Sequence, residues 1–98
     1  MEALKSVIEK VTSFPEIYIG KPSLERLYAF IGGYLYCSSE ADDHCLDGFN
    51  EYVAAKYGIN TDHNWSSIII FFSSTEEEAF ITFKELFDEY VTRKQATQ

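Results

Sequence analysis

The chain has 98 residues, 46% of them hydrophobic and 16% aromatic, which is enough to bury one core and too few for two. Sixteen Asp and Glu residues against eight Lys and Arg residues give a formal net charge of −8. A field of this sign repels nucleic acids and anionic membranes, so residues 1–98 are expected to form one domain that binds neither and favours a basic protein partner.

The first predicted element is a helix that ends before the proline at position 15. Its apolar residues recur at i, i+3, i+4 and i+7, the spacing of one helical face, and are Leu4, Val7, Ile8 and Val11. Residues 14–22 contain both prolines of the chain, and each proline disfavours helical backbone in the residue before it. We therefore expect an irregular or extended connection there.

The second predicted helix begins after Ser23, a favoured N-cap residue, and runs to about Cys37. Its apolar positions are Leu24, Leu27, Tyr28, Ile31, Tyr34 and Leu35. Gly32 and Gly33 lie within it, and each glycine costs about 1 kcal/mol relative to alanine in a helix. The pair therefore indicates close packing against another helix, or a kink.

Two more helices are expected in the second half of the chain. One follows Asp42 or Asp43 as N-cap and ends at Gly58, with an apolar stripe of Leu46, Phe49, Val53 and Tyr57. The other follows Ser74, which has Glu77 three residues on, the spacing of a capping box. Its apolar stripe is Phe80, Phe83, Phe87 and Tyr90.

Residues 65–72 are rich in β-branched and aromatic side chains, which are typical of a buried strand. A strand needs a partner to satisfy its backbone groups, and residues 17–19 are the only other candidate. We therefore expect a short buried helix, with a two-stranded pairing of residues 17–19 and 66–72 as the alternative. The predicted fold class is all-α, a compact bundle of four to five helices.

Neither a catalytic pattern nor a metal-binding pattern is present. The candidate soft or borderline metal ligands are Cys37, His44, Cys45 and His63. Their spacing matches no zinc-binding pattern such as paired CxxC or HExxH. The sequence also lacks GxSxG and a phosphate-binding glycine loop. We expect no enzyme activity, no metal and no cofactor, and a small hydrolase that uses His44 or His63 is the alternative.

The expected location is the cytoplasm. The first five residues lack the basic and apolar regions of a secretory signal, and the longest apolar run, residues 68–72, is too short to span a bilayer. In a reducing compartment Cys37 and Cys45 are expected to be thiols, with a disulfide between them as the alternative.

Acidic residues are concentrated in two places, which supply the candidate partner-binding residues. No Lys or Arg lies between residues 27 and 55, a stretch that holds Glu40, Asp42, Asp43, Asp47 and Glu51. On helical geometry, Asp47 and Glu51 share a flank at i, i+4, and the last helix carries a ridge of Glu78, Glu85 and Glu89. Ordinary solvated faces are the alternative interpretation of both groups.

Aromatic residues near these acids are candidate anchors of an interface, because Tyr and Trp are frequent hot-spot residues. The candidates are Tyr36, Tyr52 and Trp65. Each is also a candidate core residue, since a domain of this size needs its aromatic side chains inside.

Two stretches resemble small bacterial immunity proteins of contact-dependent growth inhibition and related polymorphic toxin systems. Residues 15–34 follow the pattern P-x-x-Y-x-G-x-x-S-L-x-x-L-x-x-F-x-x-G-Y. The second stretch is residues 49–57, followed by residues 64–69 and 78–87. The family usually has a serine before the tryptophan, where this chain has Asn64.

The resemblance implies an antidote that binds its cognate toxin in the cytoplasm of the producing cell and neutralises it without chemistry. Many such toxins are nucleases with basic clefts, so the implied function is to occlude a basic, nuclease-type toxin domain. The alternative is an acidic adaptor or regulatory protein-binding subunit without a toxin partner.

Overall fold

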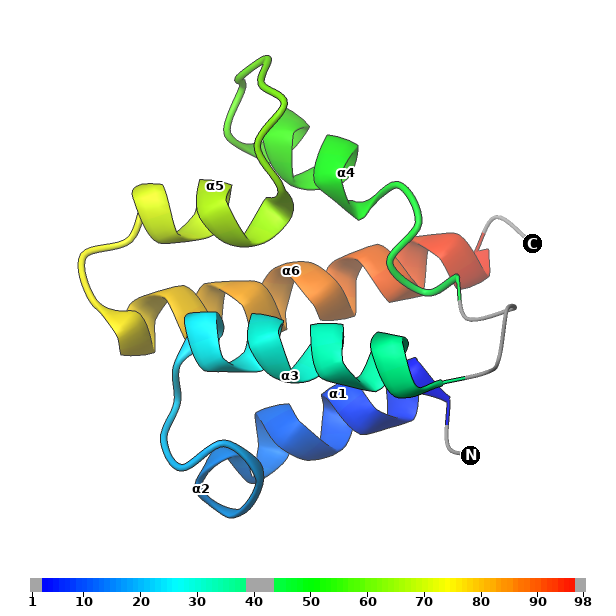
Figure 1. The fold of residues 1–98 in the computed structure, drawn as a ribbon. Coiled ribbons are helices and arrows are strands. Elements are labelled where there is room, and N and C mark those ends of the chain that lie inside the picture. The colour runs from blue at the N-terminus through cyan, green and yellow to red at the C-terminus, as the bar shows by residue number, and fades with distance from the viewer. Residues whose placement is uncertain (1–2, 39–43, 97–98) are drawn as a thin grey trace.

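The computed structural model describes residues 3–38 and 44–96, which contain six helices and no strand (Figure 1). The all-α class is confirmed, residues 65–71 form the expected short helix, and the alternative pairing of residues 17–19 with residues 66–72 is wrong. The helices are α1 (Leu4–Ser13), α2 (Pro15–Tyr18), α3 (Leu24–Cys37), α4 (Phe49–Lys56), α5 (Trp65–Phe71) and α6 (Glu76–Ala96).

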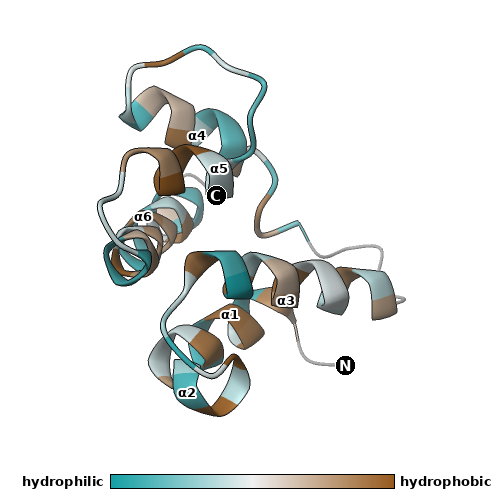
Figure 2. Ribbon diagram, turned by 60° about the vertical axis from the view of Figure 1, so that its left-hand side comes forward, coloured by the Kyte–Doolittle hydropathy of each residue, from teal (hydrophilic) through white to brown (hydrophobic). Residues whose placement is uncertain are grey.

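Helix α6 runs through the middle of the bundle and contacts α3, α4 and α5 (Figure 1). Helix α1 packs against α3, and α2 lies against α1. Seen from a second direction, α1, α2 and α3 form one group and α4, α5 and α6 form the other (Figure 2). None of the described helices is both long and apolar enough to cross a membrane.

The core has an aromatic centre around Phe49, which is fully buried. Its ring centroid lies 5.5 Å from that of Trp65, 5.9 Å from that of Phe83 and 6.1 Å from that of Phe87. All three pairs are edge-to-face, the arrangement that the quadrupoles of aromatic rings favour. Trp65 is therefore a core residue and not an interface anchor.

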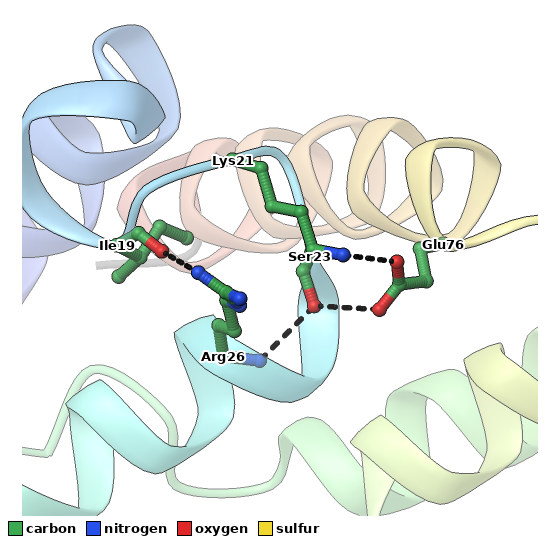
Figure 3. Close-up of polar contacts among 5 residues, drawn as sticks. All are labelled: Ile19, Lys21, Ser23, Arg26 and Glu76. Atoms are coloured by element: carbon green, nitrogen blue, oxygen red, sulfur yellow. Dashed lines mark hydrogen bonds and ion pairs between the residues drawn. The ribbon is translucent and has the colours of Figure 1, made fainter.

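The N-cap of helix α3 is connected to the first residue of α6 (Figure 3). The buried hydroxyl of Ser23 accepts a hydrogen bond from the backbone N–H of Arg26 at 3.3 Å and donates one to Oε1 of Glu76 at 3.3 Å. Lys21 Nζ lies 3.0 Å from Oε2 of the same carboxylate, and this contact lowers the pKa of Glu76 below its ordinary value. The loop before α3 is thereby fixed to the first turn of α6.

Helix α6 begins one residue later than predicted. Thr75, and not Ser74, is its cap, because Oγ1 of Thr75 accepts the backbone N–H of Glu78 at 3.0 Å. The Glu78 carboxylate in turn accepts the backbone N–H of Ser74 at 3.3 Å. The predicted pair of Ser74 and Glu77 has the same spacing as Thr75 and Glu78, so spacing alone cannot separate the two.

The one-turn helix α2 replaces the irregular connection predicted for residues 14–22. Pro15 is its first residue, a position where the missing N–H of proline costs no helical hydrogen bond. The turn after it requires glycine, because Gly20 has φ +89° and a Cβ there would lie 2.7 Å from Nη1 of Arg26. That nitrogen donates a hydrogen bond to the Ile19 carbonyl at 2.8 Å (Figure 3).

Two further expectations about α3 and α4 are wrong. A Cβ built on Gly32 or Gly33 would meet nothing within 4 Å, so the pair does not mark close helix packing, and the alternative of a kink stays a prediction. Helix α4 begins at Phe49, with Gly48 as its N-cap in left-handed backbone with φ +81°, and not after the predicted cap at Asp42 or Asp43, which lie outside the described residues. It ends at Lys56, before Gly58 with φ +65°.

Candidate protein-binding surfaces

The first predicted acidic segment is only partly described. Glu40, Asp42 and Asp43 lie outside the described residues. Asp47 lies in the turn before α4, with its carboxylate 2.8 Å from Nδ1 of His44, and Glu51 is exposed in the first turn of α4. Because Asp47 precedes the helix, the predicted helical flank of Asp47 and Glu51 is wrong.

The turn that carries Asp47 is bound to the end of α6. The Tyr90 hydroxyl donates a hydrogen bond to the Asp47 carbonyl, and Lys94 Nζ donates one to the His44 carbonyl at 3.1 Å. A Cβ on Gly48 would lie 2.7 Å from the Tyr90 hydroxyl oxygen, so glycine permits this approach. Asp47 is therefore exposed on a turn whose backbone is fixed to α6.

The predicted ridge on α6 consists of three residues with different surroundings. Glu89 accepts a hydrogen bond from the Tyr52 hydroxyl and pairs with Lys56, both on α4, and these contacts lower the pKa of Glu89. Glu78 belongs to the cap of α6. Glu85 is exposed, and within the described residues it makes no ion pair. The role of all three in partner binding stays a prediction.

The carboxylates that can best meet a partner are those without a cation of their own. Across residues 3–38 and 44–96, this holds for eight exposed carboxylates, which are Glu16, Glu25, Glu51, Asp62, Glu77, Glu78, Glu85 and Asp88. A basic partner can pair with these groups without breaking an internal ion pair. The same is not true of Glu89, whose ion pair connects α4 to α6.

Sequence reasoning missed an exposed apolar surface at the end of α5. Ile70, Phe71 and Phe72 are all exposed, and the Phe71 side chain is 80% exposed; α5 is largely hydrophobic in Figure 2. Helical periodicity could have found it. Trp65, Ile68 and Ile69 lie on one face at i, i+3 and i+4, and Ile70 and Phe71 fall outside that face.

A second exposed apolar surface lies where α1, α2 and α3 meet. It includes Phe14, Tyr18 and Ile17, the last of which is 76% exposed. Beside it is a hollow of about 580 Å³ lined in part by Phe30 and Gly33. Of the remaining candidate anchors, Tyr36 is 91% exposed at the end of α3, whereas Tyr52 is half-buried against Glu89.

The side chains that could support chemistry are dispersed. Among the described residues, no three His, Cys, Asp or Glu side chains gather where they could hold a metal ion. His44 and His63 are both exposed, and the contact of His44 is the carboxylate of Asp47. Cys37 and Cys45 are thiols, the first exposed and the second partly buried.

Comparisons with known proteins add no further constraint. No protein-family model, no curated protein and no solved structure matches the chain.

Proposed function

We propose that this domain is an immunity protein, which neutralises a basic, nuclease-type toxin domain in the cytoplasm by binding it and covering its cleft. The observation that carries the proposal is the set of exposed carboxylates without an internal cation in the described part of the chain, in particular Glu51, Glu77 and Glu85. The resemblance to immunity proteins, in residues 15–34, 49–57, 64–69 and 78–87, supplies the class of partner.

The mechanism that this proposal implies is occlusion. A nuclease cleft that holds a phosphate backbone is lined by basic side chains, and carboxylates of an inhibitor can occupy the same positions. The net charge of −8 attracts such a cleft at long range, and complementary charges raise association rates towards about 10⁸ M⁻¹s⁻¹ at low salt. Nothing in this mechanism requires a bond to be made or broken.

The direct test is co-expression with the product of the gene upstream of this one. We expect the pair to copurify as a stable complex, the chain to restore growth of cells that make the toxin, and the toxin's nuclease activity to fall in proportion to added chain. If the neighbouring genes encode no toxin and no such complex forms, the proposal fails and the adaptor alternative is favoured.

A charge-reversal series then tests which carboxylates contribute. Glu51→Lys, Glu85→Lys and Glu16→Lys each change the net charge from −8 to −6, because a carboxylate is lost and an ammonium is gained. Glu16 is exposed in α2, away from both predicted acidic groups. We expect the first two variants to associate more slowly and with a weaker salt dependence than the third. Equal rates for all three would remove Glu51 and Glu85 from the interface.

The acidic residues outside the described part of the chain enter the same series. Replacement of Glu40, Asp42 and Asp43 by alanine is expected to slow association with the toxin further, because steering depends on the summed charge near the interface. An unchanged association rate, measured by stopped-flow fluorescence at low salt, would restrict the interface to the described carboxylates.

A further inference from the structure

The exposed surface at the end of α5 is built from aromatic rings in contact with one another. The Phe72 ring stacks on that of Tyr57, with centroids 4.6 Å apart and an angle of 8° between the ring planes. Phe71 meets Phe72 edge-to-face at 5.1 Å. We call Phe71, Phe72 and Tyr57 the aromatic surface. Its outermost side chain is Phe71, four-fifths of which is in contact with solvent.

A hollow of about 450 Å³ adjoins the aromatic surface. It lies between α5 and the segment that leads into it, and it is lined by Ile59, Thr61, His63, Ser67, Ile68 and the two phenylalanines. Its volume falls in the lower part of the range of ligand pockets, roughly 300–1,000 Å³. The hollow is therefore suited to one or two apolar side chains of a partner.

The core does not require the Phe71 side chain, which is 80% exposed. The face of α5 that packs in the core consists of Trp65, Ile68 and Ile69, all buried. A phenylalanine left in water forgoes the free energy that its burial would contribute. Contiguous exposed apolar groups also promote aggregation or mark an interaction site. An exposed Phe71 beside an open apolar hollow is thus explained by a partner and not by the core.

The acidic residues in the sequence around the aromatic surface favour a partner segment with positive charge. No Lys or Arg lies between Lys56 and Lys84, a stretch with four acidic residues, Asp62, Glu76, Glu77 and Glu78. Lys21 neutralises Glu76, which leaves three negative charges. One of these charges, that of Glu78, reaches the aromatic surface itself. The pKa of Tyr57 is raised mainly by burial and in addition by the negative charge of Glu78.

We propose that the aromatic surface and its hollow bind a basic amphipathic segment of the partner protein, with apolar side chains in the hollow and Lys or Arg side chains against Asp62, Glu77 and Glu78. This inference rests on the proposed function, because it names the part of the domain that holds the basic partner. A second copy of this chain is disfavoured as the occupant, since both copies would bring the same negative charges together.

The probe is a synthetic amidated peptide of repeated Lys-Leu-Leu-Lys units, whose binding is followed by fluorescence anisotropy. We expect Phe71→Ser to weaken peptide binding about tenfold or more, as for a central hot-spot residue. Phe14→Ser, which makes the same change on the exposed surface of α1 and α2, should change binding less than about twofold. Because both side chains are exposed, circular dichroism should show that both variants fold.

Two comparisons separate the apolar and the charged contributions. A peptide with serine in place of leucine has the same positive charge as the Lys-Leu peptide. It should nevertheless lose most of the affinity for the wild-type chain. Glu77→Lys should weaken binding of the Lys-Leu peptide and reduce its salt dependence, whereas Glu16→Lys should do so less. Equal peptide affinities for wild type, Phe71→Ser and Phe14→Ser would overturn the inference.

The upstream gene product distinguishes failure of this inference from failure of the proposed function. If the wild-type chain binds that toxin and Phe71→Ser binds it equally well, the aromatic surface is not the binding site and the immunity function stands. If the wild-type chain does not bind the toxin, the immunity function fails, and the peptide measurements alone decide on the aromatic surface.

Discussion

Phe49→Ala and Phe71→Ala remove the same atoms from two positions that differ only in their surroundings. Phe49 is fully buried and contacts the rings of Trp65, Phe83 and Phe87, so its truncation should cost about 3–5 kcal/mol of unfolding free energy. Phe71 is 80% exposed. About a fifth of a burial free energy of roughly 1.5–3 kcal/mol gives an expected cost of about 0.3–0.6 kcal/mol.

Urea denaturation followed by circular dichroism measures both costs. A domain of this size has a total stability of about 5–15 kcal/mol, so Phe49→Ala should lower the urea midpoint by a large fraction or prevent folding. Phe71→Ala should leave the midpoint nearly unchanged. If Phe71→Ala is as destabilising as Phe49→Ala, then Phe71 packs within the fold, and the case for a partner at the aromatic surface is refuted.

Three further predictions concern stability. The folded chain lowers the pKa of Glu89 below its ordinary value of 4.5, so this group contributes stability above pH 4.5, and that contribution is lost as the pH falls through the folded pKa. Glu89→Gln should therefore be less stable than wild type at pH 7 and should lose less stability on acidification. Urea titrations measure this effect, with Glu85→Gln as the control. Ser23→Ala should cost about 0.5–2 kcal/mol in thermal melts, and the exposed Ser67→Ala less. Gly32→Ala should raise the unfolding free energy by about 0.5–1 kcal/mol, and a decrease would show that α3 is closely packed there.

Apolar spacing predicts the helices well where a single face repeats over several turns. Residues 4–13 and 24–37 are helical as their stripes indicate, and Ser23 is the expected N-cap. Their ends are less predictable when two local solutions have equal spacing, as for the caps of α6. The two prolines predict an irregular connection where α2 forms, because a proline ends a preceding helix and is also compatible with the first residue of a new one.

The candidate site was predictable in its charge and not in its geometry. The excess of acid follows from composition alone. That Glu89 is paired internally depends on the packing of α4 against α6, which brings Lys56 and Tyr52 to it, and a single helical stripe contains no information on that packing. The exposure of Phe71, in contrast, follows from local periodicity, because Phe71 lies outside the helical face of Trp65, Ile68 and Ile69. Its hydrophobicity alone predicts burial instead.

The exposed aromatic rings and the excess negative charge of this domain have complementary effects on association. Apolar groups in solvent favour association with any apolar surface, because burial is non-directional. A net charge of −8 opposes association between copies of the chain and with other acidic proteins, while it favours a basic partner. The rings would then supply affinity and the carboxylates would select the partner. The proposed binding surface therefore rests on the juxtaposition of the two features around α5, and not on either feature alone.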